Sequence, residues 1–318
     1  MTDVAPDVSV VICAYTEERW PDLLAAVESV QRQSIPALEI IVVIDHNAPL
    51  RARAHTHLAR AIVIENSQPR GLSGARNSGI AIARGAFIAF LDDDAVAEPD
   101  WLEHLATCCQ APHVMGAGGI VQPLWTSKRP AWFPQEFYWV IGCTYQSMPK
   151  NPQRVRNLYG GCTCMSRDVF QAVGGFKNGI GRVGTHPLGG EETELCIRAA
   201  QHWPQRVFLC EPRARIQHRI PPQRASWRYF RARCFAEGLS KAMIARVVGS
   251  KDALATERSY TLHTLSLGIL RGVADALLCF ELAGFLRAGA IVAGFAITAT
   301  GYVVGTLSAH ANKRQTRL

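Results

Sequence analysis

The chain has 318 residues, of which 48% are hydrophobic and 19% charged, a balance that excludes an intrinsically disordered protein. The net charge of +8 is unevenly distributed: residues 213–318 hold 16 Lys and Arg against 5 Asp and Glu, while residues 1–212 are slightly acidic. The ten cysteines show neither CxxC pairs nor the spacing of a disulfide framework, and the start of the chain lacks a basic, apolar leader. We therefore expect reduced thiols and a cytoplasmic location.

The first ninety residues alternate short apolar runs with segments of helical periodicity. We expect strands at 8–13, 39–45, 61–65 and 87–91, and helices at 22–33 and 72–83. This alternation predicts an α/β fold, a mostly parallel sheet with helices on both faces, whose ligands lie beyond the carboxyl ends of the strands. Polar groups occur at three such ends, at Ala14-Tyr15, Asp45 and Asp92 to Asp94.

Beyond residue 122 the alternation stops and an aromatic, Pro-rich excursion covers 122–150. A strand at 161–165, a Gly-rich loop at 174–190, a helix from Glu191, strands at 207–210 and 214–218, and a basic helix at 225–248 are expected after it. Because a pyranose ring packs well on an indole, Trp132 and Trp139 are candidates for an acceptor pocket. Ordinary core packing of these aromatic residues is equally consistent with the sequence.

The acidic triplet Asp92-Asp93-Asp94 closes a buried strand. Clustered carboxylates are unfavourable unless a cation or hydrogen-bond donors compensate, and their oxygens suit Mg²⁺ or Mn²⁺. Taken alone, the triplet could equally be an acidic loop before a helix that starts near Pro99. Its position at the end of the fourth strand favours a metal site.

Five segments of the sequence stand out together: VSVVICAYTEE, IIVVIDH, GLSGARNSGIAIARG, FLDDDAVAEPDWL and GGEETELCIR. With them, the chain resembles an inverting family 2 glycosyltransferase with the GT-A fold. They occur in the family's order and cover residues 8 to about 220, so the combination is far more specific than any one segment.

The resemblance implies a role for each matching position in binding the donor. Ala14, Tyr15 and Glu17 would border the nucleobase and ribose, Asp45 would hydrogen-bond the base, and Arg76 would lie near the ribose or diphosphate. Asp92 would face the ribose and Asp94 the metal ion. Asp93, between them, is grouped with the donor-binding residues without a defined contact.

The segment that begins at Glu191 resembles the family's Glu-Asp motif, in which the second acid deprotonates the acceptor. Here that residue is Glu192, one methylene longer than Asp, so the catalytic base is either Glu192 or Glu191. Both would also suit a helix N-terminus. His218 at a strand end resembles a histidine that completes the metal site, and Gly175 resembles a loop glycine near the acceptor.

We expect two domains, 1–222 for nucleotide-sugar binding and catalysis and 223–318 as a basic helix followed by an apolar helical hairpin. Residues 288–309 carry no charge and are long enough to span a bilayer. Arg271, Asp275 and Glu281 interrupt the preceding apolar segment, so a shallow hairpin on the anionic inner face of the cell membrane is favoured. Lys313, Arg314 and Arg317 would then stay cytoplasmic. The alternative is a soluble arrangement, in which these helices bury their faces against each other or in a homo-oligomer.

The expected activity is metal-dependent transfer of a hexosyl group, with inversion, from a nucleoside-diphosphate sugar to a hydroxyl acceptor during glycan, glycolipid or polysaccharide synthesis. UDP is the expected nucleotide, and the acceptor is a sugar, a lipid-linked sugar or a small molecule. No nucleic-acid partner is expected. A nucleotidyltransferase is one alternative, but it needs a basic Gly-rich loop where Ala14 to Glu17 is acidic. A non-catalytic membrane adaptor is the other, and the acids at Asp92, Asp94 and Glu192 argue against it.

Overall fold

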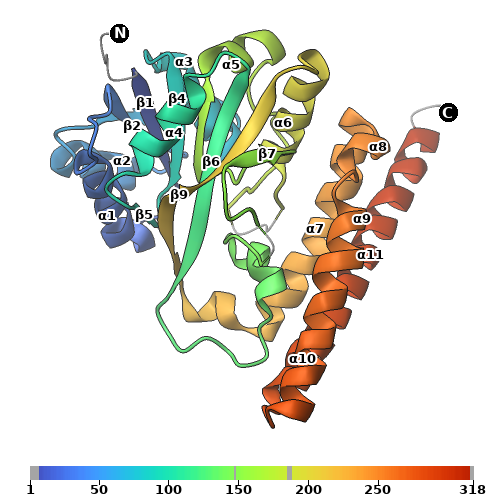
Figure 1. Ribbon diagram of the computed structural model, residues 1–318. Helices are drawn as coiled ribbons and strands as arrows, with labels where there is room; N and C mark the ends of the chain where they lie inside the picture. Colours follow the sequence, from blue (N-terminus) through green and yellow to red (C-terminus); the bar gives the residue numbers. More distant parts are fainter. Residues whose placement is uncertain (1–6, 147, 185–187, 316–318) are drawn as a thin grey trace. The chain divides into compact units, whose positions relative to one another are not determined.

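The computed structural model describes residues 7–146, 148–184 and 188–315, which form two compact units (Figure 1). The first unit comprises Met1–Gln122, Pro149–His186 and Glu191–His218, and the second comprises Pro123–Met148, Pro187–Gly190 and Arg219–Leu318. Against the expected boundary at 222/223, the aromatic segment 123–148 groups with the C-terminal helices. Residues 185–187 of the Gly-rich loop, and Arg317, lie outside the described residues, as do the side chains of Lys313 and Arg314.

The first unit is built on a nine-stranded sheet, with strand order β3-β2-β1-β4-β8-β6-β9-β5 and β7 paired to β9. The strands are β1 Val8–Ala14, β2 Glu39–Ile44, β3 Ile62–Glu65, β4 Phe87–Asp92, β5 Ala95–Ala97, β6 Val114–Trp125, β7 Gln153–Val155, β8 Cys162–Ser166 and β9 Val207–Ile220. Strands β1 to β4 pair in parallel, as their continuous apolar sequences predict, whereas β8 pairs antiparallel with β4 and β6, and β9 with β5 and β7. The sheet is therefore mixed.

Helices cover both faces of this sheet. They are α1 Trp20–Gln31, α2 Ala48–His57, α3 Leu72–Ile82, α4 Trp101–Cys109, α5 Arg167–Val173 and α6 Glu191–His202, with a short 3₁₀ helix, η1, at Glu17–Arg19. One face of the sheet, which includes Val11, Val43 and Phe90, shares a core with α3, α5 and α6. On the other face, the indole N–H of Trp101 donates to the Cys162 thiol at 3.3 Å. Burial on both faces explains the unbroken apolar strands.

One continuous strand, β9, replaces the two strands expected at 207–210 and 214–218. The proline between them, Pro212, does not end the strand. The side chain of Glu211 accepts the backbone N–H of Arg213 at 3.0 Å, so this donor is satisfied beside the proline. The strand thus reaches from β7 at Cys210 to β5 at His218.

The second unit is helical. Its elements are η2 Gln135–Ile141, η3 Pro222–Ala225, α7 Trp227–Val248, α8 Ser250–Ala253, α9 Glu257–Ser259, a π-helical turn η4 Tyr260–Leu265, α10 Ser266–Leu278 and α11 Ala283–Gln315. Figure 1 shows α10 and α11 side by side as a hairpin, with α7 running along α11. Among the described residues, Ala283–Ser308 is the one helical stretch long and apolar enough to cross a membrane.

Aromatic rings explain why segment 123–148 joins this unit. The ring of Trp132 lies 5.1 Å from Trp227 and 5.5 Å from Phe230, centroid to centroid, and Phe133 lies 5.5 Å from Phe230. Phe230 is fully buried. The excursion therefore forms part of the core beneath α7.

Candidate active site

The acidic triplet forms the connection between two strands. Asp92 is the last residue of β4, Asp93 and Asp94 form the turn, and β5 begins at Ala95. Strand β5 pairs antiparallel with β9, and this register places Ala95 opposite His218. As a result, the His218 Nε2 atom lies 3.0 Å from Asp94 Oδ1.

Asp92, Asp94 and His218 form a group that we call the metal triad, since one ligand atom from each lies within 4.8 Å of the others. The side chains of Asp94 and His218 are buried, whereas that of Asp92 is 38% exposed and leaves the group open to solvent. Two carboxylates and an imidazole suit Mn²⁺, and also Mg²⁺ where water completes the shell. The structure thus brings together the two expected metal ligands, Asp94 and His218, and adds Asp92 to them.

Arg19, in η1, is not among the residues that the sequence predicts for the site. Its Nη1 atom lies 3.0 Å from Asp93 Oδ1 and 3.1 Å from Asp94 Oδ2. Burial raises the pKa of Asp93 to about 7, and the charges of Asp94 and Asp92 add to the rise while Arg19 opposes it. Arg19 therefore offsets part of the cost of crowding Asp93 and Asp94 into one turn.

Arg76 of α3 joins the metal triad to the start of α6. It is 3% exposed, and its guanidinium lies 3.0 Å from Glu191 Oε1 and 3.5 Å from Asp92 Oδ1. Burial alone would lower the pKa of Arg76, but Glu191 and Asp92 outweigh it and the pKa is raised. This arginine stays charged and holds one acid from each of two elements.

Two adjacent glycines allow the backbone to approach these side chains closely. A Cβ atom on Gly161 would lie 2.2 Å from Asp92 Oδ2, and one on Gly160 would lie 2.8 Å from Arg76 Nη1. Gly181, at φ +100°, approaches Glu191 in the same way, with 2.8 Å from an added Cβ to Oε2. The Gly-Gly pair just before β8 was a signal in the sequence that could have pointed to this contact.

Ala14, Tyr15 and Asp45 meet at the carboxyl edge of the parallel strands. The backbone N–H of Asp45 donates to Ala14 O at 2.8 Å, and Asn47 Nδ2 donates to Tyr15 O at 3.1 Å. The carboxylate of Asp45 accepts hydrogen bonds from Asn66 Nδ2 at 2.7 Å and from the Gly71 N–H at 3.0 Å. Asp45 therefore orders the loop that leads into α3.

Tyr15 and Glu17 follow this edge toward the triplet. Tyr15 is half-buried, and the guanidinium carbon of Arg19 lies 5.4 Å from the centre of its ring. Glu17 is exposed in the first turn of η1. Of the residues expected around the nucleobase, Tyr15 is thus linked to the metal triad through Arg19, which lies 3.1 Å from Asp94.

Glu191 and Glu192 differ in their surroundings. Glu191 is 5% exposed and bound by Arg76, whereas Glu192, the next residue of α6, is half-buried. Both occupy the first turn of the helix, where the backbone dipole favours a negative charge. Glu192 is the more accessible of the two.

The three residues expected near an acceptor have other contacts. Trp132 belongs to the aromatic core of the second unit, and Trp139 Nε1 donates to the Tyr260 hydroxyl at 2.8 Å. The carbonyl of Gly175 accepts a hydrogen bond from Arg198 at 2.8 Å, and an added Cβ at Gly175 would lie 2.2 Å from Asn77 Oδ1. These contacts give each of the three residues a role in packing. That they bind the acceptor stays a prediction.

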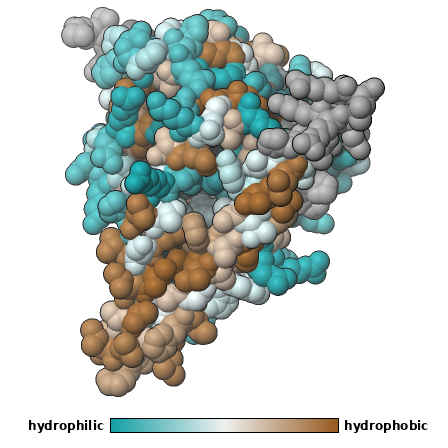
Figure 2. All heavy atoms as spheres, turned by 90° about the vertical axis from the view of Figure 1, so that its right-hand side faces the viewer, coloured by the Kyte–Doolittle hydropathy of each residue, from teal (hydrophilic) through white to brown (hydrophobic). Residues whose placement is uncertain are grey.

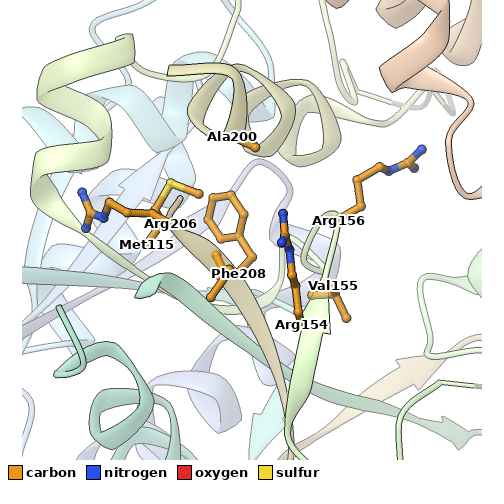
Figure 3. A pocket seen from close by; sticks show the side chains of 8 residues that line it. Met115, Arg154, Val155, Arg156, Ala200, Arg206 and Phe208 are labelled. Carbon is orange, nitrogen blue, oxygen red and sulfur yellow. The ribbon is translucent and has the colours of Figure 1, made fainter. Parts of the chain in front are cut away.

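A separate cavity of about 360 Å³ lies in the first unit, away from the triad residues (Figure 3). Its lining comprises Met115, Arg154, Val155, Arg156, Ala200, Arg206, Val207 and Phe208. Figure 3 shows Arg206 and Arg156 pointing to opposite sides of Phe208, and Arg206 pairs with Asp168 at 2.7 Å. Arg206 and Arg156 therefore do not converge on a common anion.

Comparison with known proteins agrees with this architecture. Residues 9–174 match the family described as Glycosyl transferase family 2. The chain is 35% identical over 241 residues to a glucosyl-dolichyl phosphate glucuronosyltransferase of Haloferax volcanii, covering 74% of this chain and 77% of that one. It is 25% identical over 236 residues to the succinoglycan biosynthesis protein ExoM of Rhizobium meliloti, covering 71% of each.

Two solved glycosyltransferases share the fold. The mannosyltransferase PcManGT of Pyrobaculum calidifontis, in complex with GDP-Man and Mn²⁺, aligns with a TM-score of 0.57 and 18% identity over 94% of this chain and 90% of that one. GalNAc-T7, with UDP, GalNAc and Mn²⁺, aligns with a TM-score of 0.55 and 19% identity over 74% and 48% respectively. The fold is therefore GT-A, and the chain belongs to glycosyltransferase family 2.

Proposed function

We propose that this glycosyltransferase moves a hexosyl group from a nucleoside-diphosphate sugar, UDP-linked in our expectation, to a hydroxyl of a lipid-linked sugar, with inversion at the anomeric carbon. The observation that carries the proposal is the convergence of the metal triad with the start of α6. Arg76 contacts an acid on each side, Asp92 and Glu191. Donor binding and acceptor activation would then occur at one place.

The metal triad is the proposed site for Mn²⁺ or Mg²⁺, held by Asp94 and His218 with Asp92 at the open side. A bound divalent cation would neutralise the diphosphate as it departs. The Mn²⁺ found in both structural relatives supports manganese in particular. Ala14, Tyr15, Glu17 and Asp45 are the proposed border of the base and ribose.

Glu192 is the proposed catalytic base. The neighbouring Glu191 is bound by the buried Arg76, which occupies one of its carboxylate oxygens, so Glu191 suits a positioning role. Glu192 would take the proton of the acceptor hydroxyl while the hydroxyl oxygen attacks the anomeric carbon and the diphosphate leaves.

The proposed acceptor is a sugar carried on a polyprenyl phosphate. The relative from Haloferax volcanii acts, by its name, on glucosyl-dolichyl phosphate, and its likeness covers most of both chains. The apolar stretch Ala283–Ser308 supports a site of action beside a membrane. All ten cysteines are free thiols, which supports our proposal of the reducing, cytoplasmic face.

Calorimetric titration with UDP, GDP and dTDP, with and without Mn²⁺, tests the donor site. We expect one nucleotide to bind in a Mn²⁺-dependent manner, and Asp94→Asn to abolish that dependence. Glu192→Gln should keep donor binding and lose at least about 100-fold in transfer. Glu28→Gln, the same change on an exposed face of α1, is the matched control and should retain full activity. Full transfer by Glu192→Gln would exclude Glu192 as the base.

The stereochemistry needs its own measurement. Proton NMR of the product formed from an α-linked donor should show a β linkage. An α-linked product would overturn the inverting mechanism while leaving the metal triad and the family assignment intact.

A further inference from the structure

The α10–α11 hairpin has small residues on its inner face. Of the buried residues of α10, Gly272 and Ala276 lie against Gly284 of α11, whereas Gly268 lies against Glu136. A Cβ atom on Gly272 would lie 2.7 Å from Gly284 O and 3.3 Å from Ala288 Cβ. The two backbones are therefore in close contact, as in helices that associate within lipid.

Large apolar side chains occupy the outer surface of the same hairpin. Phe280 is 88% exposed, Leu278 77% and Leu282 74%. Others exposed on α10 and the start of α11 are Leu267, Leu270, Leu277, Phe285, Leu286 and Val292. Figure 2 shows hydrophobic residues gathered at the end of the second unit where the hairpin turns. A surface of this kind needs a partner other than water.

The charges near the turn pair with one another. Arg287 lies 2.7 Å from Asp275 and 2.8 Å from Glu281, so one cation bridges both arms of the hairpin. Pairing lowers the cost of moving these groups out of water. Of the charges that argued against insertion in the sequence, Asp275 and Glu281 thus share the cation Arg287, and Arg271 lies 3.5 Å from Glu136.

The second unit also carries exposed cations. Lys128, Arg228, Arg231, Arg246 and Lys251 are exposed in the second unit, whereas its acids at Glu237 and Glu257 are each shielded by a contact with Lys241. This charge is complementary to an anionic lipid surface, and its combination with an apolar tip matches interfacial membrane proteins.

We propose that the α10–α11 hairpin is a re-entrant anchor, which enters one leaflet of an anionic phospholipid bilayer with residues 277–286 leading. The 13 residues of α10 measure about 20 Å, against about 30 Å for the hydrocarbon core, so the turn stays within the membrane. The later part of α11 packs along α7, where a Cβ on Gly301 would lie 2.2 Å from Phe235 O. That contact keeps α11 from crossing as an isolated helix.

Cys279, in the leading turn, is a built-in probe, because it is exposed while the other nine cysteines are buried or half-buried. The full chain, labelled there with an environment-sensitive fluorophore, is diluted from detergent into vesicles of phosphatidylcholine with 30% phosphatidylglycerol. We expect a blue-shifted emission, quenching by lipid-borne nitroxides and at least about a tenfold loss of quenching by aqueous iodide. Vesicles of phosphatidylcholine alone should give a weaker response.

Phe280→Glu combined with Leu282→Glu should lower the vesicle-bound fraction at least tenfold, whereas Leu38→Glu, the same change at an exposed leucine of the first unit, should not.

Reaction of Cys279 with an impermeant thiol reagent enclosed in the vesicles would show a true span and overturn the re-entrant arrangement. Iodide protection that depends on protein concentration and not on vesicles would show that a second copy covers the surface. Nucleotide binding is measured on the same samples. If it is retained, either result overturns the membrane anchor alone and leaves the proposed activity intact.

Discussion

Replacing Arg76 with Met should destabilise the first unit strongly. The side chain is 3% exposed and compensates Glu191, itself 5% exposed, so its removal leaves a buried carboxylate without its partner. Breaking a buried pair in this way costs about 3–5 kcal/mol. For a unit of this size, such a loss lowers the unfolding temperature by roughly 6–20 °C. Differential scanning calorimetry of the detergent-solubilised full chain at pH 7 measures it.

Two further variants make this result specific. Arg84→Met removes an arginine that is 69% exposed and pairs with Glu39, and it should cost at most about 1 kcal/mol. Adding Glu191→Gln to Arg76→Met should recover at least about 1 kcal/mol, because the unpaired charge is gone. Equal losses for Arg76→Met and Arg84→Met, or no recovery in the double variant, would refute the bridging role of Arg76.

Three more predictions concern pH, metal and backbone contact. Burial alone would raise the pKa of Glu39, but hydrogen bonds from Ser9 and Arg84 outweigh it and hold the pKa below its ordinary value. Its stabilisation is thus present above about pH 4.5 and lost as the pH falls through the folded-state pKa. Glu39→Gln should therefore cost about 1–3 kcal/mol in urea unfolding at pH 7, and progressively less as the pH falls below about 4.5. His218→Ala should weaken Mn²⁺ binding by at least about tenfold in a titration followed by electron paramagnetic resonance. Gly161→Ala should displace Asp92, since the added Cβ would lie 2.2 Å from its Oδ2, and lower nucleotide affinity with little change in unfolding temperature.

Each of these has a result that would contradict it. A penalty for Glu39→Gln that is the same at pH 3 and pH 7 would mean that the charge of Glu39 does not matter. Unchanged Mn²⁺ affinity in His218→Ala would remove His218 from the metal triad. Unchanged nucleotide affinity in Gly161→Ala would show that the position of Asp92 does not matter for nucleotide binding.

The parallel half of the sheet could be predicted because its strands are buried on both faces, which leaves runs such as Ile40 to Ile44 entirely apolar. In the antiparallel half, the strands at 161–165, 207–210 and 214–218 were expected, whereas β5, β6 and β7 were not. Strand β6 contains Gly116, Gly118 and Gly119, which argue against a strand when read locally. They are needed because neighbouring strands come close: a Cβ on Gly119 would lie 2.1 Å from Ala214 O. That requirement is visible only in three dimensions.

Within the site, the strand-end acids could be predicted from their position after apolar runs. Arg19 could not be predicted, because its partner Asp93 is 74 residues away. Nothing in the sequence around Arg19 indicates that its charge pairs with the acidic turn. The sequence left open whether Glu191 or Glu192 is the catalytic base for a related reason. The contact that distinguishes them is the pairing of Glu191 with Arg76, a residue distant in the sequence. Short polar helices were equally hard to find: α2 buries only Leu50 and Ala54.

The pairing of Ala95 with His218 makes the metal site sensitive to the length of one strand. Side chains alternate along β9, where His218 is buried and its neighbours Gln217 and Arg219 are exposed. Inserting or deleting a single residue between Pro212 and His218 would bring an outward-facing amide or guanidinium into the place of the imidazole. Homologues and engineered chimeras should therefore tolerate length changes in surface loops, while the spacing within this strand stays fixed.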